Sequence, residues 1–207
     1  MTRSISLHNI SAPSELRPGP LRQHLKVTVR ESLHTDRLCL VPGTAALGRA
    51  ELNDRAQFAR LLGAGVPPEW PPPLNDEASM TWFAEHVEAN PDAVGWAAWY
   101  FLLKEPDGGL TAVGNGGFKG VPDPSGSVEV GYSILEAHQR RGLATEGVGA
   151  LIDWAFAHRR VNRIIAQTLP DLRPSIRVLE KLGFTFVGDG LEEGAIMYRL
   201  EPKGSSR

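Results

Sequence analysis

The run Gln139-Arg-Arg-Gly-Leu-Ala-Thr-Glu146 has the clearest chemical potential in this chain. It lies between a segment of alternating apolar residues and a segment of helical spacing, so it should join a strand to the start of a helix. The first turn of a helix has unpaired N–H groups and the positive end of the helix dipole, and phosphate binds well there. Gly142 and Ala144 let the backbone approach an anion, and Arg140 and Arg141 add positive charge. These features predict a pyrophosphate site, with a polar helix start and two solvated arginines as the alternative.

Two common kinds of phosphate site do not match this run. It lacks the Lys-Ser/Thr pair of a P-loop, and the chain has no G-x-G-x-x-G of a dinucleotide-binding fold. A nucleotide-binding protein that uses the same helix start is still an alternative. Thermal stabilisation by CoA compared with ATP and NAD would separate the two hypotheses.

The elements that position this run follow from apolar periodicity and from turn residues. Strands are expected at 37–41, 96–103, 110–118, 128–135, 161–169, 184–187 and 195–200, and helices at 45–62, 75–88, 144–158 and 175–182. The order is strands, then strand-helix-strand-helix, then a hairpin. This order predicts an α+β sheet with one parallel crossover in its middle.

Composition limits the possible function classes. The chain has 207 residues, 42% of them hydrophobic, and a formal net charge of -2. It therefore does not indicate a broad nucleic-acid-binding surface. No apolar run approaches the roughly 20 residues that span a bilayer, so no membrane partner is expected. The single cysteine, Cys39, lies between Leu38 and Leu40, is predicted to be a small core residue, and fits a reducing, cytoplasmic location.

The domain boundaries are read from the ends of the regular pattern. Residues 1–33 are expected to form a tail or arm, with a short strand at 25–29, residues 34–202 the folded domain, and residues 203–207 a second tail. The six histidines show no metal-ligand spacing and there is no cysteine pair, so no metal is expected. The oligomeric state stays open, a homodimer included.

Gln139, Gly142 and Ala144 match the pattern Q/R-x-x-G-x-G/A. This resembles the pyrophosphate loop of the GCN5-related N-acetyltransferase (GNAT) superfamily. The segment 175–184, Ser-Ile-Arg-Val-Leu-Glu-Lys-Leu-Gly-Phe, resembles the family's helix that ends in K-x-G-F. In that family the loop follows the fourth strand and begins the long central helix.

Further segments are similar to one branch of that superfamily, the ribosomal-protein N-terminal acetyltransferases. These segments are Thr35–Pro42, Glu129–Tyr132 and Gly142–Glu146. The resemblance covers roughly residues 35–202. It implies a mixed, mostly antiparallel central sheet of six to seven strands with helices on both faces.

The resemblance also implies the reaction, in which an amine attacks acetyl-CoA directly and no covalent enzyme intermediate forms. The acceptor would be a protein N-terminus or a small-molecule amine. In the family the fourth strand carries a bulge and splays from the fifth, and an N–H of the fourth strand polarises the thioester carbonyl. The residues that the resemblance assigns to CoA are Ile134, Leu135, Gln139, Arg140, Arg141, Gly142, Leu143, Ala144 and Thr145.

The resemblance gives two candidate catalytic residues. Glu129 would act as the base that takes a proton from the amine, and it would also contact the acceptor; the alternative is a solvated or salt-bridged strand residue. Ser175 would donate to the leaving thiolate; the alternative is a hydroxyl that bonds its own helix backbone. Many family members have Asn where this chain has Leu172, and a tyrosine acid where it has Leu179. A CoA-binding sensor without catalysis is therefore the alternative function.

Aromatic residues supply the remaining candidates. Trp70 lies in a proline-rich loop and is predicted to form a lip of the acceptor pocket, or else to pack the loop on the core. Tyr132 and Trp154 are predicted to pack in the core.

Overall fold

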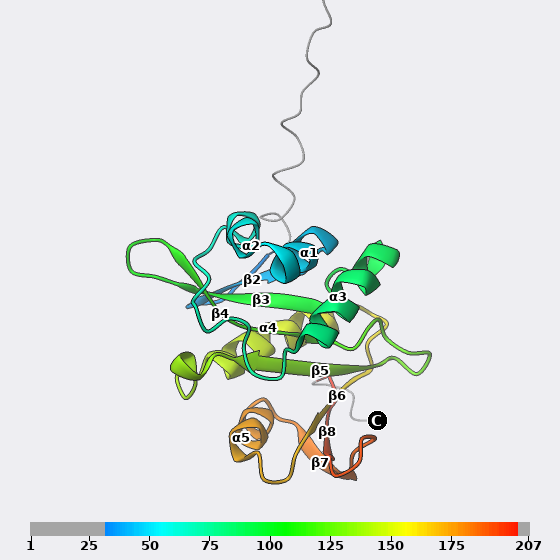
Figure 1. The fold of residues 1–207 in the computed structure, drawn as a ribbon. Helices are drawn as coiled ribbons and strands as arrows, with labels where there is room; N and C mark the ends of the chain where they lie inside the picture. Colours follow the sequence, from blue (N-terminus) through cyan, green and yellow to red (C-terminus); the bar gives the residue numbers. More distant parts are fainter. Residues whose placement is uncertain (1–31, 203–207) are drawn as a thin grey trace, which may run out of the picture.

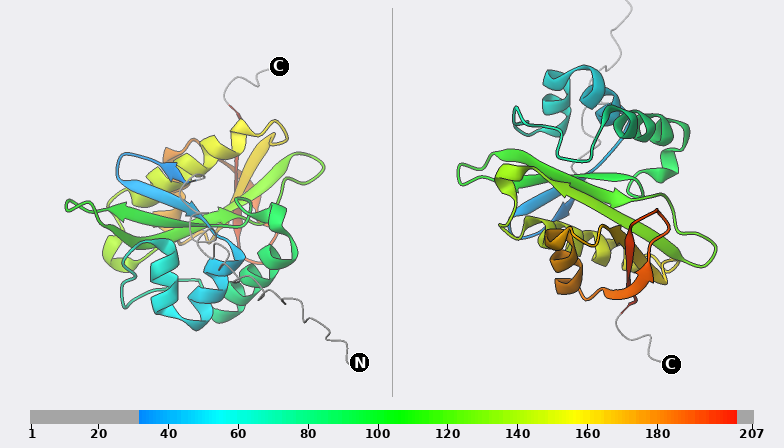
Figure 2. Two further views of the ribbon diagram at one scale, coloured as in Figure 1. Left: turned by 90° about the horizontal axis from the view of Figure 1, so that it is seen from above. Right: turned by 60° about the horizontal axis from the view of Figure 1, so that its bottom comes forward.

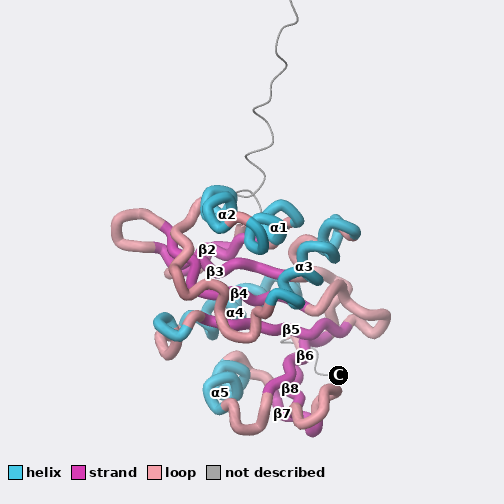
Figure 3. Tube along the Cα trace, in the orientation of Figure 1, coloured by secondary structure: helices cyan, strands magenta, loops and turns pink. Residues whose placement is uncertain are grey.

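The computed structural model describes residues 32–202. The strand expected at 25–29, like most of the expected N-terminal arm and the C-terminal tail, lies outside these residues. Within residues 32–202 the chain forms one eight-stranded sheet with helices packed on it (Figures 1 and 3). The strands are β1 (Leu33–His34), β2 (Leu38–Pro42), β3 (Ala98–Lys104), β4 (Leu110–Phe118), β5 (Ser127–Ile134), β6 (Arg163–Thr168), β7 (Thr185–Asp189) and β8 (Ile196–Leu200).

The strand order in the sheet is β1-β2-β3-β4-β5-β6-β8-β7. β5 and β6 run parallel, and every other pair of neighbours is antiparallel. The expected α+β class, mixed sheet and central parallel crossover are therefore confirmed. The sheet is larger than the six to seven strands expected, because the two residues of β1 are too few to produce a sequence pattern.

The helices cover both faces of the sheet, as Figure 2 shows. Their bounds are α1 (Ala45–Asn53), α2 (Arg55–Leu62), α3 (Glu77–Ala89), α4 (Leu143–Ala157) and α5 (Arg173–Lys181), with short 3-10 turns η1 (Pro91–Ala93) and η2 (Glu136–His138). α1, α2 and α3 lie on one face, and α4 and α5 lie on the other (Figure 2). We call these the α1–α3 face and the α4–α5 face.

One long helix was expected at 45–62, and the structure has two. Asp54 leaves the helical conformation, with φ -150°, and its carboxylate accepts a hydrogen bond from the Gln57 N–H. Asp54 thus ends α1 and caps α2, because an aspartate side chain satisfies a free N–H at a helix start. Apolar periodicity runs through this break and cannot reveal it.

The feature that matters most for function is an opening between β5 and β6. These strands pair only at Ser127–Arg163, Val128–Ile164 and Glu129–Ile165. Beyond Glu129, β5 continues on β4 alone, and β6 continues on β8 alone. The sheet therefore divides in its middle, at the parallel crossover. The splay expected between these strands is present. The register shifts lie elsewhere in the sheet, between β3 and β4 near Phe101 and between β7 and β8 near Phe186, and none is found in the pairing of β5 with β4 or β6.

Side-chain alternation along β5 assigns its residues to the two faces of the sheet. Val128, Val130 and Ile134 are buried in the core cluster that also contains the apolar residues of α4 and α5. Glu129 and Ser133 therefore point to the α1–α3 face. In agreement, the Ser133 hydroxyl donates to the Pro73 carbonyl in the loop before α3, at 2.6 Å.

Candidate functional site

The turn that begins α4 presents free backbone N–H groups. Arg140 has φ 58° and Gly142 has φ 80°, while Arg141 between them keeps a negative φ. Alternation of this kind turns successive N–H groups toward one side and forms an anion-binding concavity. Within residues 32–202, no group accepts a hydrogen bond from the N–H groups of residues 140–145, and α4 has no side-chain cap. We call residues 139–145 the anion loop; its arginines are exposed.

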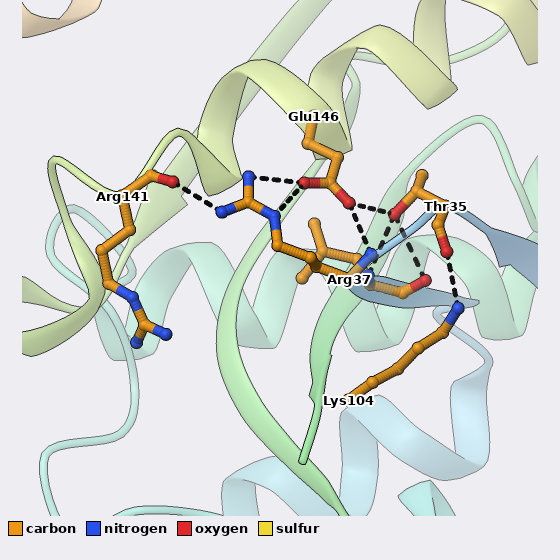
Figure 4. A network of polar contacts seen from close by, with 6 residues as sticks. Thr35, Arg37, Lys104, Arg141 and Glu146 are labelled. Atoms are coloured by element: carbon orange, nitrogen blue, oxygen red, sulfur yellow. Dashed lines mark hydrogen bonds and ion pairs between the residues drawn. The ribbon is translucent and has the colours of Figure 1, made fainter. Parts of the chain in front are cut away.

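Arg37 holds this loop from the neighbouring strand end (Figure 4). Its guanidinium forms an ion pair with Glu146 at 2.6 Å and donates to the Arg141 carbonyl at 2.8 Å. The Glu146 carboxylate also accepts from the Thr35 hydroxyl at 2.6 Å and from the Arg37 N–H at 2.8 Å. Burial alone would raise the pKa of Glu146, but the hydrogen bonds from Thr35 and Arg37 hold that pKa below its ordinary value. These contacts fix the start of α4 without occupying the free N–H groups.

The Arg37–Glu146 contact joins two separate sequence segments. The resemblance to the family treats Thr35–Pro42 and Gly142–Glu146 as separate segments. In the structure, the contacts between Arg37 and Glu146 join the two. A side chain at Gly142 would bring its Cβ to 3.4 Å from the Arg37 guanidinium, in a backbone conformation that favours glycine. The shape of the loop therefore already requires glycine at position 142, before any bound anion is considered.

Other side chains of the anion loop have local partners. The Gln139 amide donates to the Ile134 carbonyl at 3.0 Å, and Arg141 lies 3.0 Å from His138 Nδ1. Leu143 is 1% exposed and packs in the core, so only its backbone is available at the loop. Ala144 and Thr145 are half-buried in the first turn of α4.

The opened edge of β5 carries N–H groups that the ladder does not use. The Leu135 N–H donates to the Val113 carbonyl of β4 at 2.9 Å, and neighbouring residues of a strand point these groups to opposite sides. The N–H groups of Tyr132 and Ile134 therefore point toward the opening. Leu135, one of the residues expected to contact CoA, has its N–H on β4 and its side chain in the core of the α1–α3 face.

A cavity of about 640 Å³ lies at the opening and reaches both faces of the sheet. Residues of the α1–α3 face, such as Glu129 and Gln167, line it together with residues of α5 such as Ser175. Gly131 also lines it, and a Cβ added at Gly131 would meet no atom within 4 Å. The cavity thus lies where the sheet divides and is lined by residues of both faces.

On the α1–α3 face the cavity carries an anchored carboxylate. Glu129 forms an ion pair with Lys119 at 2.6 Å and accepts from the Gln167 amide at 3.0 Å, and its side chain is 13% exposed. Lys119 also pairs with Glu192 at 2.8 Å. Burial acts to lower the pKa of Lys119, but its bonds to Glu129 and Glu192 outweigh burial and raise it, so Lys119 stays a cation.

The α4–α5 side of the cavity carries hydroxyl groups. The Tyr132 hydroxyl lies 3.1 Å from the Ser175 hydroxyl and donates to the Ser175 carbonyl at 3.2 Å. Thr168, 7% exposed, lines the same cavity. Its hydroxyl is the one buried side-chain polar atom in residues 32–202 without a hydrogen-bond partner. A buried polar atom of this kind is costly unless a ligand pairs with it.

The structure brings some predicted residues together and separates another. Glu129 and Ser175 line one cavity, and the anion loop begins the helix on its α4–α5 side. Trp70 does not line it: it is 7% exposed, packs on Phe58 and Tyr100, and donates to Glu51 at 2.8 Å. The loop after Trp70 reaches the cavity through Leu74 and Asn75 instead, because Asn75 accepts from Asn115 at 2.7 Å.

Tyr132 packs against the core as predicted, but its hydroxyl also reaches the cavity, which sequence reasoning did not foresee. Lys119, Gln167 and Thr168 also line the cavity and were not considered. Lys119 follows β4, and Gln167 and Thr168 lie on β6. No local pattern reveals the register of these residues to β5. Trp154, by contrast, packs on Trp96, Trp99 and Phe118 as a core residue.

No group of three or more histidine, cysteine, aspartate or glutamate side chains in residues 32–202 is placed to hold a metal ion. In the same residues, no helix combines the length and the apolar character that crossing a membrane requires.

Comparison with known proteins adds to this geometry. A family model described as "Acetyltransferase (GNAT) domain" matches residues 37–185. The uncharacterized N-acetyltransferase YjdG of Bacillus subtilis (strain 168) is 34% identical over 152 residues, which are 73% of this chain and 88% of that protein.

Solved structures share the fold. The ribosomal-protein-S5-alanine acetyltransferase from Vibrio fischeri has a TM-score of 0.56 at 18% identity, over 85% of this chain and 99% of that one. The microcin C7 self-immunity acetyltransferase MccE, solved with acetyl-CoA and AMP, has a TM-score of 0.53 at 15% identity, over 81% of this chain and 94% of that one. With the family match over most of the described residues, the chain belongs to the GNAT family of acetyl-CoA-dependent N-acetyltransferases.

Proposed function

We propose that this protein transfers the acetyl group of acetyl-CoA to a primary amine, which attacks the thioester directly within the opening between β5 and β6. One observation carries the proposal: the divided sheet joins a carboxylate on one face to hydroxyl groups on the other. The anion loop with its free N–H groups begins on the hydroxyl side. Transfer between two substrates needs groups from both faces of the sheet to reach the same carbonyl carbon.

The anion loop is the proposed holder of the CoA diphosphate. Six successive N–H groups, residues 140–145, are free of acceptors in the described chain, and Arg140 and Arg141 are exposed beside them. Charge-assisted hydrogen bonds from such a helix start stabilise phosphate oxygens. The structure of MccE with acetyl-CoA supports this choice of cosubstrate, since its fold matches over most of both chains.

The pantetheine arm would continue from the loop along the opened edge of β5. Tyr132 and Ile134 direct their N–H groups toward this edge, and either can donate to the thioester oxygen as it gains negative charge. The unpaired Thr168 hydroxyl across the opening can take a polar group of the same arm. A hydrogen bond to a ligand would remove the cost of its burial.

The amine would enter from the α1–α3 face, where Glu129 lies. The Glu129 carboxylate, held by Lys119 and Gln167, can accept the proton that the attacking ammonium must lose. On the other face, the Ser175 hydroxyl lies beside the position proposed for the sulfur. The acceptor is a protein N-terminus or a small amine, and the Vibrio fischeri protein, named for a ribosomal-protein alanine, supports testing peptides with N-terminal alanine.

The experiment is incubation with acetyl-CoA and a panel of amines, read by mass spectrometry. The panel includes peptides with free N-termini, the same peptides blocked at the N-terminus, and simple primary amines. An acetyl group added to free amines only supports the proposal, and the panel separates peptide from small-molecule acceptors. Tight CoA binding with no transfer to any amine would instead support a CoA-binding sensor.

A further inference from the structure

The tyrosine acid that many GNAT enzymes carry on the helix of α5 is replaced here by Leu179, which is fully buried. A tyrosine hydroxyl nevertheless reaches the cavity from another element, β5. We infer that Tyr132 is the proton donor to the CoA sulfur, with the Ser175 hydroxyl as its partner. This inference rests on the proposed function and names the acid for the same site.

The geometry places the Tyr132 hydroxyl at the opening. Its ring leaves β5 on the α4–α5 side, and its hydroxyl meets α5 at Ser175, 3.1 Å from Oγ and 3.2 Å from the carbonyl oxygen. Both residues line the cavity, so the hydroxyl pair joins β5 to α5 beside the opening between β5 and β6. The carboxylate of Glu129 points to the opposite face. Base and acid therefore lie on opposite sides of the proposed carbonyl carbon.

The chemistry favours Tyr132 over the other hydroxyls that line the cavity. A phenol is a far stronger acid than the alcohols of Ser175 and Thr168, and thus the better proton donor. Burial raises the pKa of Tyr132 and outweighs the opposing hydrogen bond with Ser175, so the phenol is protonated and ready to donate. The Ser175 hydroxyl can accept from Tyr132 and donate onward, which links the phenol to water.

Glu129 takes one proton from the ammonium, the nitrogen forms a bond to the carbonyl carbon, and the carbon–sulfur bond breaks. The sulfur leaves with the bonding electron pair and receives the Tyr132 proton. The phenolate regains a proton from water through Ser175, while the amide nitrogen and Glu129 release theirs to water. The products are the acetylated amine and CoA thiol.

The test uses Tyr132→Phe in the full chain, with Tyr198→Phe as the matched control. Tyr198 is a buried tyrosine that does not line the cavity. We expect Tyr132→Phe to lower kcat about 100-fold, the lower end for loss of a general acid, with KM for acetyl-CoA within about twofold. Tyr198→Phe should keep kcat within about twofold, because its hydroxyl has no part in the step.

A second measurement needs no acceptor. The affinities of CoA and desulfo-CoA are compared by calorimetry at a pH where the CoA thiol is partly ionised. The wild-type preference for CoA should fall about tenfold in Tyr132→Phe, since one hydrogen bond to the sulfur is lost. Desulfo-CoA affinity should not change.

The outcomes separate the two proposals. A wild-type protein that neither binds CoA nor acetylates any amine contradicts the proposed function itself. Wild-type kcat in Tyr132→Phe, with the same preference for CoA over desulfo-CoA, overturns only the assignment of Tyr132. An equal loss of affinity for CoA and for desulfo-CoA in Tyr132→Phe also overturns the assignment. That result would show that the ring packs the site and that its hydroxyl makes no bond to the sulfur.

Discussion

The anion loop and the cavity beside it differ in how they are built. The loop offers backbone N–H groups, and the Arg37–Glu146 contact holds its shape from outside. The cavity offers side chains from β5, β6 and α5, which meet only because the sheet divides. Under the proposed function, the loop would hold one constant group, the CoA diphosphate. The cavity would change its acceptor by changing side chains while the loop stays the same.

The largest effect should come from the cavity. Glu129→Gln keeps the size and hydrogen-bonding reach of the side chain but removes the base, so kcat should fall about 100-fold or more, with little change in CoA affinity. Steady-state kinetics with an accepted amine and calorimetry with CoA measure the two quantities. Glu192→Gln is the control, because Glu192 also pairs with Lys119 but is exposed. Full activity in Glu129→Gln would remove Glu129 from the mechanism.

A change in the anion loop should instead lower the affinity for CoA. Gly142→Val places a branched side chain at φ 80° and against Arg37, so the N–H groups lose their common direction and CoA affinity should fall about tenfold or more. Calorimetry checks this change. Gly108→Val gives a similar strain at φ 86° in a turn with no neighbour within 4 Å, and it should leave CoA affinity unchanged. Equal CoA affinity for Gly142→Val and wild type would show that the loop is not the binding site.

A third change fills the acceptor side of the cavity. Gly131 faces open space and has no left-handed φ, so Gly131→Leu should fold normally. The leucine side chain would occupy the path of the amine and lower kcat/KM for the acceptor about tenfold, with CoA affinity unchanged. Kinetics over a range of amine concentrations tests this prediction. A loss of CoA affinity with normal acceptor kinetics would mean that the two sides of the cavity are assigned in reverse.

The smallest effect concerns the Arg37–Glu146 contact and is a stability effect. The folded-state pKa of Glu146 lies below the ordinary value of 4.5, so its contribution is complete above that value and is lost as pH falls through the folded pKa. Glu146→Gln should lower the free energy of unfolding by about 1–2 kcal/mol at neutral pH, and by less in acid. Urea unfolding at the two pH values measures this, with Glu88→Gln as an exposed control. An equal loss at both values would contradict the assignment.

The turn that forms the anion loop could be predicted from the sequence more readily than the cavity, for a physical reason. An anion loop is local: one glycine, one small residue and two arginines within eight positions carry it. The α+β class of the sheet was predictable because most strands are long and alternate regularly. The short strand β1 was not predictable. The cavity depends on register: Gln167 reaches Glu129 only because β5 and β6 stay paired up to Glu129 and Ile165. Trp70 was ambiguous because burial depends on α1 and α2, which pack over it.

A crystal structure with bound acetyl-CoA would show both halves of the site at once. We expect diphosphate oxygens within hydrogen-bonding distance of N–H groups between residues 140 and 145. We also expect the thioester in the opening between β5 and β6, with Glu129 on one side and Tyr132 on the other. Acetyl-CoA bound elsewhere, or a diphosphate held by side chains while those N–H groups face water, would contradict the proposed site.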